Sequence, residues 1–241
     1  MRLDAQARRP RPAAAPVGID LWMWPLEVGQ AEGDALEELL SADERVRALR
    51  YHLAHDRRQF IVGRARLRQI LADYAASPPE TLEFCYGEQG KPALSGHRSL
   101  CFNLSHSGGC AALAVAGCDV GIDIEEVRPI DRRVAQRFFS ADENAVLDRL
   151  CEGDWLHGFY RCWTRKEAVL KALGSGLSLA AAEATDGGPC LDGAVQWSIV
   201  DLALSPPFVG AIAARTMGAQ AAIRRRWQNS RTSGALGCNT A

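Results

Sequence analysis

The stretch Val120-Gly121-Ile122-Asp123-Ile124-Glu125 is the part of the sequence from which most of the fold and function can be predicted. Its apolar and acidic residues alternate, which is the pattern of a β-strand with one buried face and one polar face. Residues two apart on a strand point to the same side, so Asp123 and Glu125 share one face and the isoleucines point into the core. Adjacent carboxylates repel each other unless a cation lies between them. The pair therefore indicates either a cation site or two solvated acids at the end of a strand.

A second acidic stretch, Trp-Thr-Arg-Lys-Glu-Ala-Val-Leu-Lys, occupies residues 163–171. We predict a helix here, with Trp163 and Leu170 on its buried side. Glu167 and Lys171 are four residues apart and share a helix face, a spacing that is also typical of a surface salt bridge. The two stretches together would place three acids and a lysine around one divalent cation and a phosphate.

The chain has 241 residues, which is enough for one large domain or two small ones with a core. Apolar residues make up 47% and charged residues 24%, as in ordinary soluble proteins, and the formal net charge of -1 gives no general attraction to nucleic acid or membranes. No apolar run that could serve as a signal peptide follows the N-terminal arginines, and no stretch reaches the length of a membrane span. The eight cysteines form no Cys-x-x-Cys pair, so we expect reduced, mostly buried thiols and a cytoplasmic protein.

Hydrophobic patterning predicts the remaining elements. We expect a helix at residues 56–74, and strands at residues 17–24, 82–86, 100–104, 110–116, 195–202 and 208–213. Residues 1–16, with their prolines and arginines, are expected to be disordered. From Gly218 onward the sequence turns polar. We expect residues 218–241 to form a solvated, flexible tail, although the run Arg224-Arg225-Arg226-Trp227 could bind an acidic partner.

One short pattern occurs twice: Ser41-Ala42-Asp43-Glu44 returns as Ser140-Ala141-Asp142-Glu143. Each is a capping box, in which the serine caps the first helical turn and the glutamate reaches back to the serine N–H. Each also precedes a helix with apolar periodicity. The repeat predicts an α+β fold of two similar α/β halves, residues 17–117 and 118–217, related by a pseudo-twofold axis. The cleft between such halves is the natural place for a ligand.

Two further residues are candidates for binding phosphate. Lys91 lies in the tight turn Gly90-Lys91-Pro92, which would hold its charge in a fixed place. His106 lies in Asn-Leu-Ser-His-Ser-Gly-Gly at residues 103–109, where serine, histidine and backbone donors follow a strand and can meet phosphate oxygens. No Gly-Lys-Ser/Thr ends this segment, so it is not a P-loop, and it lacks the Gly-x-Ser-x-Gly pattern of serine hydrolases. With the three acids, these residues describe a magnesium–pyrophosphate site.

Five motifs in a fixed order give the chain a resemblance to a known family. They are Gly90-Lys91-Pro92, Phe-Asn-Leu-Ser-His-Ser at 102–107, the stretch at 120–125, Arg-Phe-Phe-Ser at 137–140 and the stretch at 163–171. Over about residues 17–215 the chain resembles 4'-phosphopantetheinyl transferases of the surfactin-synthetase-activating (Sfp) type. The phosphopantetheinyl transferase-like fold, two halves with the active site in the cleft between them, agrees with the internal repeat.

The resemblance implies roles for individual residues. Asp123, Glu125 and Glu167 would hold Mg2+, or Mn2+ in its place. The site for coenzyme A, the co-substrate, would be formed by Arg47, Arg58, Lys91, Pro92, Ser105, His106 and Lys171. Catalysis would fall to Glu167, Lys171 and His106.

One position departs from the family pattern. A basic residue often stands three residues before the glycine matched by Gly63, and in this chain that residue is Phe60. Arg57 or Arg58 would have to supply the missing charge beside the nucleotide.

The implied reaction transfers the 4'-phosphopantetheine arm of coenzyme A to a serine hydroxyl of an apo acyl, peptidyl or aryl carrier protein, and releases adenosine 3',5'-bisphosphate. Either Glu167 or a water on the metal would take the serine proton. Arg132, Arg133 and Arg137 could meet the acidic face of a carrier, or they could simply be solvated. We expect a monomer, with no nucleic-acid or membrane partner.

Two other functions would use part of the same residue set. A magnesium-dependent nucleotide or pyrophosphate hydrolase would need the acids and an activated water, and it would release adenosine bisphosphate without any carrier. A non-catalytic module that binds coenzyme A or a carrier would keep Lys91 and His106 but has no use for all three acids. The joint presence of the acids favours the transferase.

Overall fold

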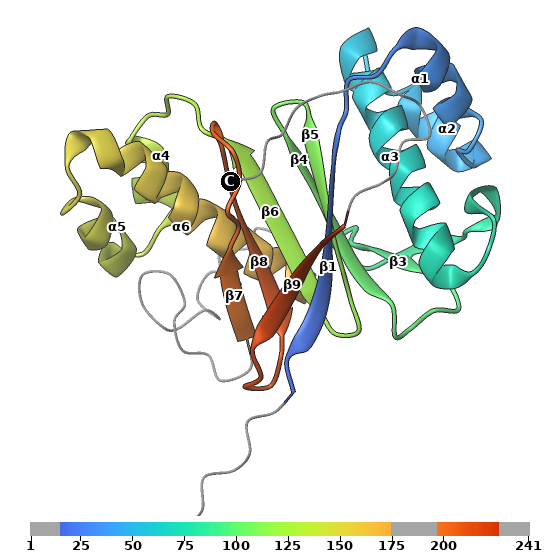
Figure 1. Cartoon of the computed structure of the whole chain (residues 1–241). Helices are drawn as coiled ribbons and strands as arrows, with labels where there is room; N and C mark the ends of the chain where they lie inside the picture. The colour runs from blue at the N-terminus through green and yellow to red at the C-terminus, as the bar shows by residue number, and fades with distance from the viewer. Residues whose placement is uncertain (1–14, 175–196, 227–241) are drawn as a thin grey trace, which may run out of the picture.

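The computed structural model describes residues 15–174 and 197–226, and its layers are visible in Figure 1. The helices are α1 (Gln30–Glu37), α2 (Ala42–Ala48), α3 (Ala54–Ala75), α4 (Arg133–Phe138), α5 (Ala141–Leu147) and α6 (Glu152–Leu173). The strands are β1 (Val17–Pro25), β2 (Phe84–Tyr86), β3 (Pro92–Leu94), β4 (Cys101–Ser107), β5 (Cys110–Ala116), β6 (Val120–Glu126), β7 (Trp197–Asp201), β8 (Phe208–Arg215) and β9 (Ala221–Arg226). They pair as β4-β5-β1-β9, β6-β8-β7 and β2-β3. Helices α1–α3 lie outside the first sheet and α4–α6 outside the second, which confirms the predicted α+β class.

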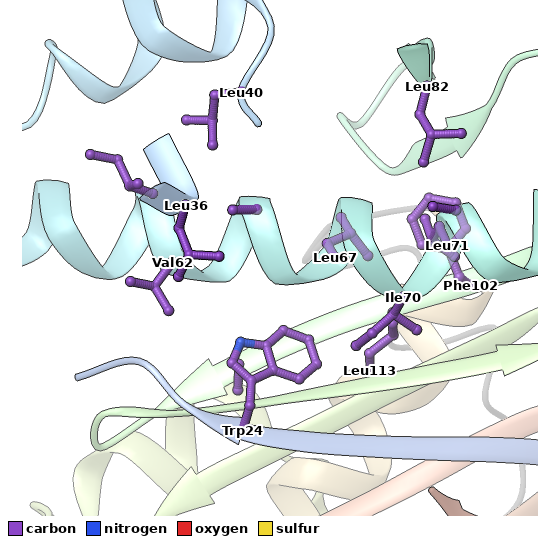
Figure 2. Packing of buried hydrophobic residues seen from close by; sticks show 14 of the residues in the cluster. Trp24, Leu36, Leu40, Val62, Leu67, Ile70, Leu71, Leu82, Phe102 and Leu113 are labelled. Carbon is purple, nitrogen blue, oxygen red and sulfur yellow. The ribbon is translucent and has the colours of Figure 1, made fainter. Parts of the chain in front are cut away.

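Strand β5 is almost wholly apolar because both of its faces are buried. Its sequence is Cys-Ala-Ala-Leu-Ala-Val-Ala, and its side chains alternate between two cores. Leu113 and Val115 belong to the core beneath α3, together with Trp24 of β1 and Leu67 of α3 (Figure 2). The alanines of the other face join the core between the two sheets, with the isoleucines of β6. Small side chains here let the second sheet approach the first closely.

Strand β6 lies directly against helix α6 at Gly121. A Cβ atom at this position would lie 2.0 Å from the carbonyl oxygen of Ala168 and 2.4 Å from the amide nitrogen of Ala172, both backbone atoms of α6. Glycine permits this approach because it has no side chain. The contact brings the end of α6 beside the acids of β6, so the fold assembles the two acidic stretches at one place.

Both predicted capping boxes are present. In each, the N–H of the N-cap serine donates to the glutamate three residues on, at N···O distances of 3.0 Å for Glu44 and 2.7 Å for Glu143. Each box opens a short helix that precedes a 22-residue helix, α3 or α6. A basic residue of that long helix binds each glutamate: Arg68 Nε lies 2.6 Å from Glu44, and Lys166 Nζ lies 3.1 Å from Glu143. The repeat therefore has a local structural counterpart, while the pseudo-twofold axis stays a prediction.

We expect Glu44→Gln to destabilise the fold strongly. Glu44 is 2% exposed and binds both Arg64 and Arg68, so the change leaves two buried guanidinium groups without their carboxylate. Breaking such a network costs about 3 kcal/mol or more, which lowers the melting temperature of a chain of this size by roughly 6 °C or more. Thermal unfolding at neutral pH checks this. The exposed Glu80→Gln control should change stability by less than about 0.5 kcal/mol.

The same network predicts a pH dependence. Burial opposes ionisation of Glu44, but the guanidinium groups of Arg68 and Arg64 hold its pKa below the ordinary value of 4.5. A carboxyl whose pKa is depressed by folding contributes stability that is complete above its unfolded pKa and is lost as the pH falls through its folded pKa. The difference in melting temperature between the parent and Glu44→Gln should therefore shrink on acidification below pH 4.5. A difference that stays constant down to acid unfolding would contradict this account.

The C-terminal segment differs from the prediction. Residues 221–226 form β9, which pairs in parallel with β1, where the sequence suggested a solvated tail from Gly218. Arg224 Nε and Arg226 Nε donate to Oδ1 of the buried Asp20 at 2.8 and 3.1 Å. The sequence concealed the strand because it is an edge strand whose side chains are mostly exposed, so charged residues replace the apolar alternation. Residues 1–14 and 227–241 of the two predicted terminal segments lie outside the described residues.

The other predicted elements are confirmed, with shifted ends. The strand expected at 82–86 begins only at Phe84, and the described part of the strand expected at 195–202 is Trp197–Asp201. The shift that matters for function is in β4, which continues to Ser107 instead of ending at residue 104. The Ser-His-Ser segment therefore lies inside a strand, where the sequence suggested a loop after one.

Two predictions from composition can be compared with the described ranges. Among the cysteines there, Cys162 is buried, Cys85 and Cys151 are exposed and three are half-buried, so the expectation of mostly buried thiols is wrong. Cys190 and Cys238 lie outside the described residues. No helix in residues 15–174 or 197–226 combines the length and the apolar character needed to cross a bilayer.

Candidate active site

Asp123 and Glu125 share one face of β6, and the isoleucines between and before them are fully buried on the other. Asp123 is only 3% exposed. Its Oδ1 accepts hydrogen bonds from Lys171 Nζ at 2.5 Å and from Ser105 Oγ at 3.0 Å. Its Oδ2 is buried and has no hydrogen-bond partner among the described residues. A buried carboxylate oxygen without a partner is a position that a bound cation would complete.

Helix α6 brings Glu167 and Lys171 to the same place. Lys171 joins the two acidic stretches, because its ion-pair partner is Asp123 on β6. Burial raises the pKa of Asp123 to about 6, although the Lys171 charge opposes the rise. Burial also raises the pKa of Glu167, which Lys171 lowers and Glu125 raises further. Glu125 therefore lies near enough to both other acids to affect their pKa values.

The donor set fits a hard divalent cation, but the protein side chains alone do not close the site. Carboxylate oxygens are the ligands that Mg2+ prefers, and Asp123 Oδ2 lacks a partner in the described part of the chain. Within residues 15–174 and 197–226, however, no three His, Cys, Asp or Glu side chains are gathered closely enough to hold a metal ion. The arrangement suits a cation that takes its remaining ligands from a second molecule, as Mg2+ does with substrate phosphates.

Lys91 reaches the site from the turn before β3. Its Nζ donates to the carbonyl oxygens of Val120 at 3.1 Å and Ala172 at 2.8 Å, so it ties the start of β6 to the end of α6. A lysine is favourable there because the last carbonyls of a helix lack intrahelical partners. Desolvation lowers the pKa of Lys91, and the Asp119 carboxylate opposes this. An ammonium group has three donors, so these two bonds leave one N–H for a ligand.

Ser105 does not offer its hydroxyl to a ligand in this structure. The side chain is 4% exposed and points to β6. Its Oγ accepts from Lys171 Nζ at 3.0 Å and from the Ile124 N–H at 3.3 Å, and it donates to Asp123. A hydroxyl has one donor and two acceptor positions, and all three are taken. The role of Ser105 in binding coenzyme A stays a prediction, and it would require one of these contacts to be exchanged for the ligand.

His106 follows Ser105 on the strand and so points to the opposite side. There it lines a cavity of about 340 Å³ beside α3 and β3, whose walls also include Arg47, Tyr51, Phe60, Tyr86 and Pro92. Partial desolvation and the Lys171 charge lower the pKa of His106, against the opposing charge of Glu125. The imidazole is therefore within electrostatic reach of the acids although it belongs to a different wall.

A second cavity adjoins the first. It has a volume of about 210 Å³ and is lined by Lys91, Glu167 and Lys171, among others. Gly90, Pro92, Asn103 and Leu104 line both cavities, so the two lie side by side, and we call the pair the hollow. Within it, the structure brings together the predicted site residues Arg47, Lys91, Pro92, His106, Glu167 and Lys171.

The wall of the larger cavity is aromatic where the family pattern has a basic residue. The Arg47 guanidinium lies 5.4 Å from the centroid of the Phe60 ring, and the Tyr51 ring lies 5.3 Å from the same ring. The two rings are tilted by 33° to each other, and such aromatic contacts give the cavity an apolar surface with a cation beside it. Phe60 therefore contributes a contact surface, in place of the charge that the family pattern would supply.

Arg58 lies in a recess next to this hollow. It donates to Gln30 at 2.5 Å, from Nη2 to Oε1, and lines the recess with Glu27 and His55, while Leu26 and Gln59 line both this recess and the larger cavity. The suggestion that Arg58 replaces the missing basic residue stays a prediction. Arg64 lines the larger cavity instead, where it binds Glu44 and donates from Nη2 to Tyr86 Oη at 2.8 Å. Arg57, Arg64 and Arg68 are seven and four residues apart, which places them on one side of a helix, and this spacing is the sequence signal that could have pointed to Arg64.

Two family models match the chain. The model described as 4'-phosphopantetheinyl transferase superfamily matches residues 119–197. The model described as 4'-phosphopantetheinyl transferase, N-terminal, matches residues 29–118. Together they span the larger cavity, the serine-containing strand β4 and all three acids.

Relatives of known name support the same family. The chain is 35% identical over 212 residues to 4'-phosphopantetheinyl transferase HetI of Nostoc sp., which covers 84% of this chain and 90% of HetI. It is 38% identical over 146 residues to psf-1 of Bacillus pumilus, covering 60% of this chain and 62% of that protein. It is 30% identical over 152 residues to Sfp of Bacillus subtilis, covering 63% and 68%. The chain therefore belongs to the 4'-phosphopantetheinyl transferase superfamily, whose members transfer the phosphopantetheine arm of coenzyme A to carrier proteins.

Proposed function

We propose that this enzyme transfers the 4'-phosphopantetheine arm to a serine hydroxyl of apo carrier domains in a Mg2+-dependent reaction that releases adenosine 3',5'-bisphosphate. The observation that carries the proposal is the buried Oδ2 of Asp123, which has no partner among the described residues and lies on the carboxylate paired with Lys171, on the strand that also carries Glu125. Bound there with Asp123, Glu125 and Glu167, Mg2+ or Mn2+ would neutralise pyrophosphate charge and stabilise the leaving phosphate.

The two adjoining cavities of the hollow define an orientation for bound coenzyme A. We place the nucleotide in the larger cavity, where Arg47 provides charge and Phe60 and Tyr86 provide aromatic surface. The pyrophosphate then lies in the smaller cavity, within reach of Lys91 and Lys171. Each lysine has two N–H donors engaged by the described protein groups and a third left for a phosphate oxygen. His106 lines the larger cavity and would donate to another phosphate oxygen from there.

Glu167 is the residue we assign as general base. The carrier serine must lose its proton as it attacks phosphorus, and the acceptor must be ionised yet basic enough to take that proton. Burial and the neighbouring Glu125 raise the pKa of Glu167 in the protein alone, whereas a cation bound to the same carboxylate would make it a weaker base, so the two roles of Glu167 compete. Lys171 lies on the same side of α6 as Glu167. It contributes positive charge while negative charge builds up on the leaving phosphate.

The carrier domain would approach over α4. Arg132, Arg133 and Arg137 are exposed there, and the ring of Phe138 is 36% exposed beside them. Cations around one apolar side chain suit the acidic helical face of a carrier. We further propose that residues 17–117 and 118–217 act as two halves around one site, so that a monomer is a complete enzyme without a nucleic-acid or membrane partner.

Incubation with coenzyme A, Mg2+ and a panel of apo acyl, peptidyl and aryl carrier domains tests the proposal. Mass spectrometry should show a gain of one phosphopantetheine arm on at least one carrier. Removal of divalent cations with EDTA should stop the gain, and Mg2+ or Mn2+ should restore it. Adenosine bisphosphate released without a carrier would instead favour hydrolysis, and transfer that survives EDTA would exclude the metal site.

A further inference from the structure

Strands β4 and β6 lie next to each other where the two sheets meet, although they belong to different sheets (Figure 1). The N–H groups on one edge of β6 are satisfied by side chains of β4 in place of a backbone ladder. Every second residue takes part, and the donor-to-acceptor distances are 2.9 Å from Ile122 N to Asn103 Oδ1, 3.3 Å from Ile124 N to Ser105 Oγ and 3.0 Å from Glu126 N to Ser107 Oγ. The period of two places all three acceptors on one side of β4.

The two serines each make a second bond to β6. Ser105 Oγ donates to Asp123 Oδ1 at 3.0 Å, and Ser107 Oγ donates to Glu125 Oε2 at 2.7 Å. Each hydroxyl therefore binds the backbone N–H of one β6 residue and the carboxylate of the β6 residue that precedes it. Each serine hydroxyl thus links an acidic side chain of β6 to a backbone N–H of the same strand. This fixes the orientation of the acidic side chain relative to its own backbone.

We propose that Ser105 and Ser107 are positioning residues, which aim the carboxylates of Asp123 and Glu125 at the cation, while Asn103 holds the strands in register. The inference rests on the proposed metal site and names the groups of the first half that orient it. Hydrogen bonds from neighbouring groups orient metal-binding carboxylates and tune their affinity. For Asp123, the bond from Ser105 occupies Oδ1 together with Lys171, and this leaves Oδ2 turned to the cation position.

Ser107 gives the cleaner test, because the described contacts of Ser105 also include Lys171. We expect Ser107→Ala, in the presence of coenzyme A, to bind Mn2+ roughly tenfold more weakly in a titration followed by electron paramagnetic resonance. At saturating Mn2+ the KM for coenzyme A should stay within about twofold of the parent, since the nucleotide cavity is unchanged. Ser107→Thr keeps the hydroxyl and should restore Mn2+ affinity. Ser77→Ala, which removes a hydroxyl bonded to the Ala75 carbonyl far from the acids, is the matched control.

A double-mutant cycle separates aiming from general support of the fold. If Ser107 acts through Glu125, then Ser107→Ala added to Glu125→Ala should weaken Mn2+ binding by less than about twofold. Additive losses, or equal Mn2+ affinity in Ser107→Ala and the parent, would overturn the inference while leaving the metal proposal intact. Failure of the parent with coenzyme A to bind Mn2+ would overturn both. Should Ser107→Ala not fold, Ser107→Thr and Ser107→Cys, with a strong and a weak donor, carry the same comparison.

Discussion

Glu167→Gln should retain coenzyme A binding and lose at least about 100-fold in the rate of transfer. The amide keeps the size of the side chain but removes the proton acceptor and its negative charge. In our proposal the nucleotide binds in the larger cavity, which Glu167 does not line, and only the pyrophosphate lies beside Glu167 in the smaller one, so most of the affinity for coenzyme A should remain. Calorimetry with coenzyme A and single-turnover transfer to an apo carrier measure the two quantities separately. Glu152→Gln, an exposed glutamate in the first turn of the same helix, should change neither.

The pH profile distinguishes a base from a simple charge. If Glu167 takes the serine proton, transfer by the parent should fall as the pH drops through the pKa of Glu167, which burial raises in the protein alone and a bound cation would lower again. This acidic limb should be absent from the residual activity of Glu167→Gln. A variant that loses activity but keeps the same limb would assign Glu167 to metal binding alone.

Gly121→Ala should damage both stability and transfer, although it adds a single methyl group. The new Cβ would lie 2.0 Å from the Ala168 carbonyl oxygen and 2.4 Å from the Ala172 amide nitrogen. Because these are backbone atoms, no side-chain rotation can relieve the clash. Helix α6 must therefore shift from β6, at a cost of about 3 kcal/mol. A displacement of this kind separates Lys171 from Asp123, and a misplacement of about 1 Å in an active site can lower the rate about 100-fold.

The matched control for this change is Gly153→Ala. Gly153 lies in the first turn of α6, and a Cβ atom there would meet nothing within 4 Å. Alanine is the better helix former by about 1 kcal/mol, so this variant should be as stable as the parent or slightly more so. Thermal unfolding and transfer assays on both variants decide the matter. Equal behaviour of the two would mean that β6 and α6 tolerate separation.

The acidic stretches could be predicted because their spacing has a direct structural meaning. Two residues apart on a strand and four apart on a helix each define one face, and the structure places Asp123, Glu125, Glu167 and Lys171 accordingly. The spacing could not show which acid forms the ion pair with Lys171, because Glu167 on the same helix and Asp123 on β6 compete for it. Lys171 pairs with Asp123, which is the more deeply buried acid and whose charge would be costly without a partner.

The roles of Lys91 and Ser105 could not be predicted for a related reason. Both were read as ligands for phosphate, but their polar groups are also required by unpaired backbone atoms that only the tertiary structure brings near. Lys91 meets two carbonyl oxygens at the end of α6 and the start of β6. Ser105 meets an N–H on the free edge of β6. A sequence shows which groups can donate or accept, whereas the folded chain decides which unpaired neighbours they must satisfy.

The pairing of β9 with β1 has a consequence for how the chain acquires its structure during synthesis. Asp20 and Arg224 are separated by 204 positions, so the edge of β1 stays uncovered until nearly the whole described chain has left the ribosome. Contacts between such distant positions close slowly, and an open strand edge can pair with other chains while it waits. The first sheet is thus the earliest part to be made and among the last to be completed, and the growing polypeptide is most exposed to aggregation in that interval.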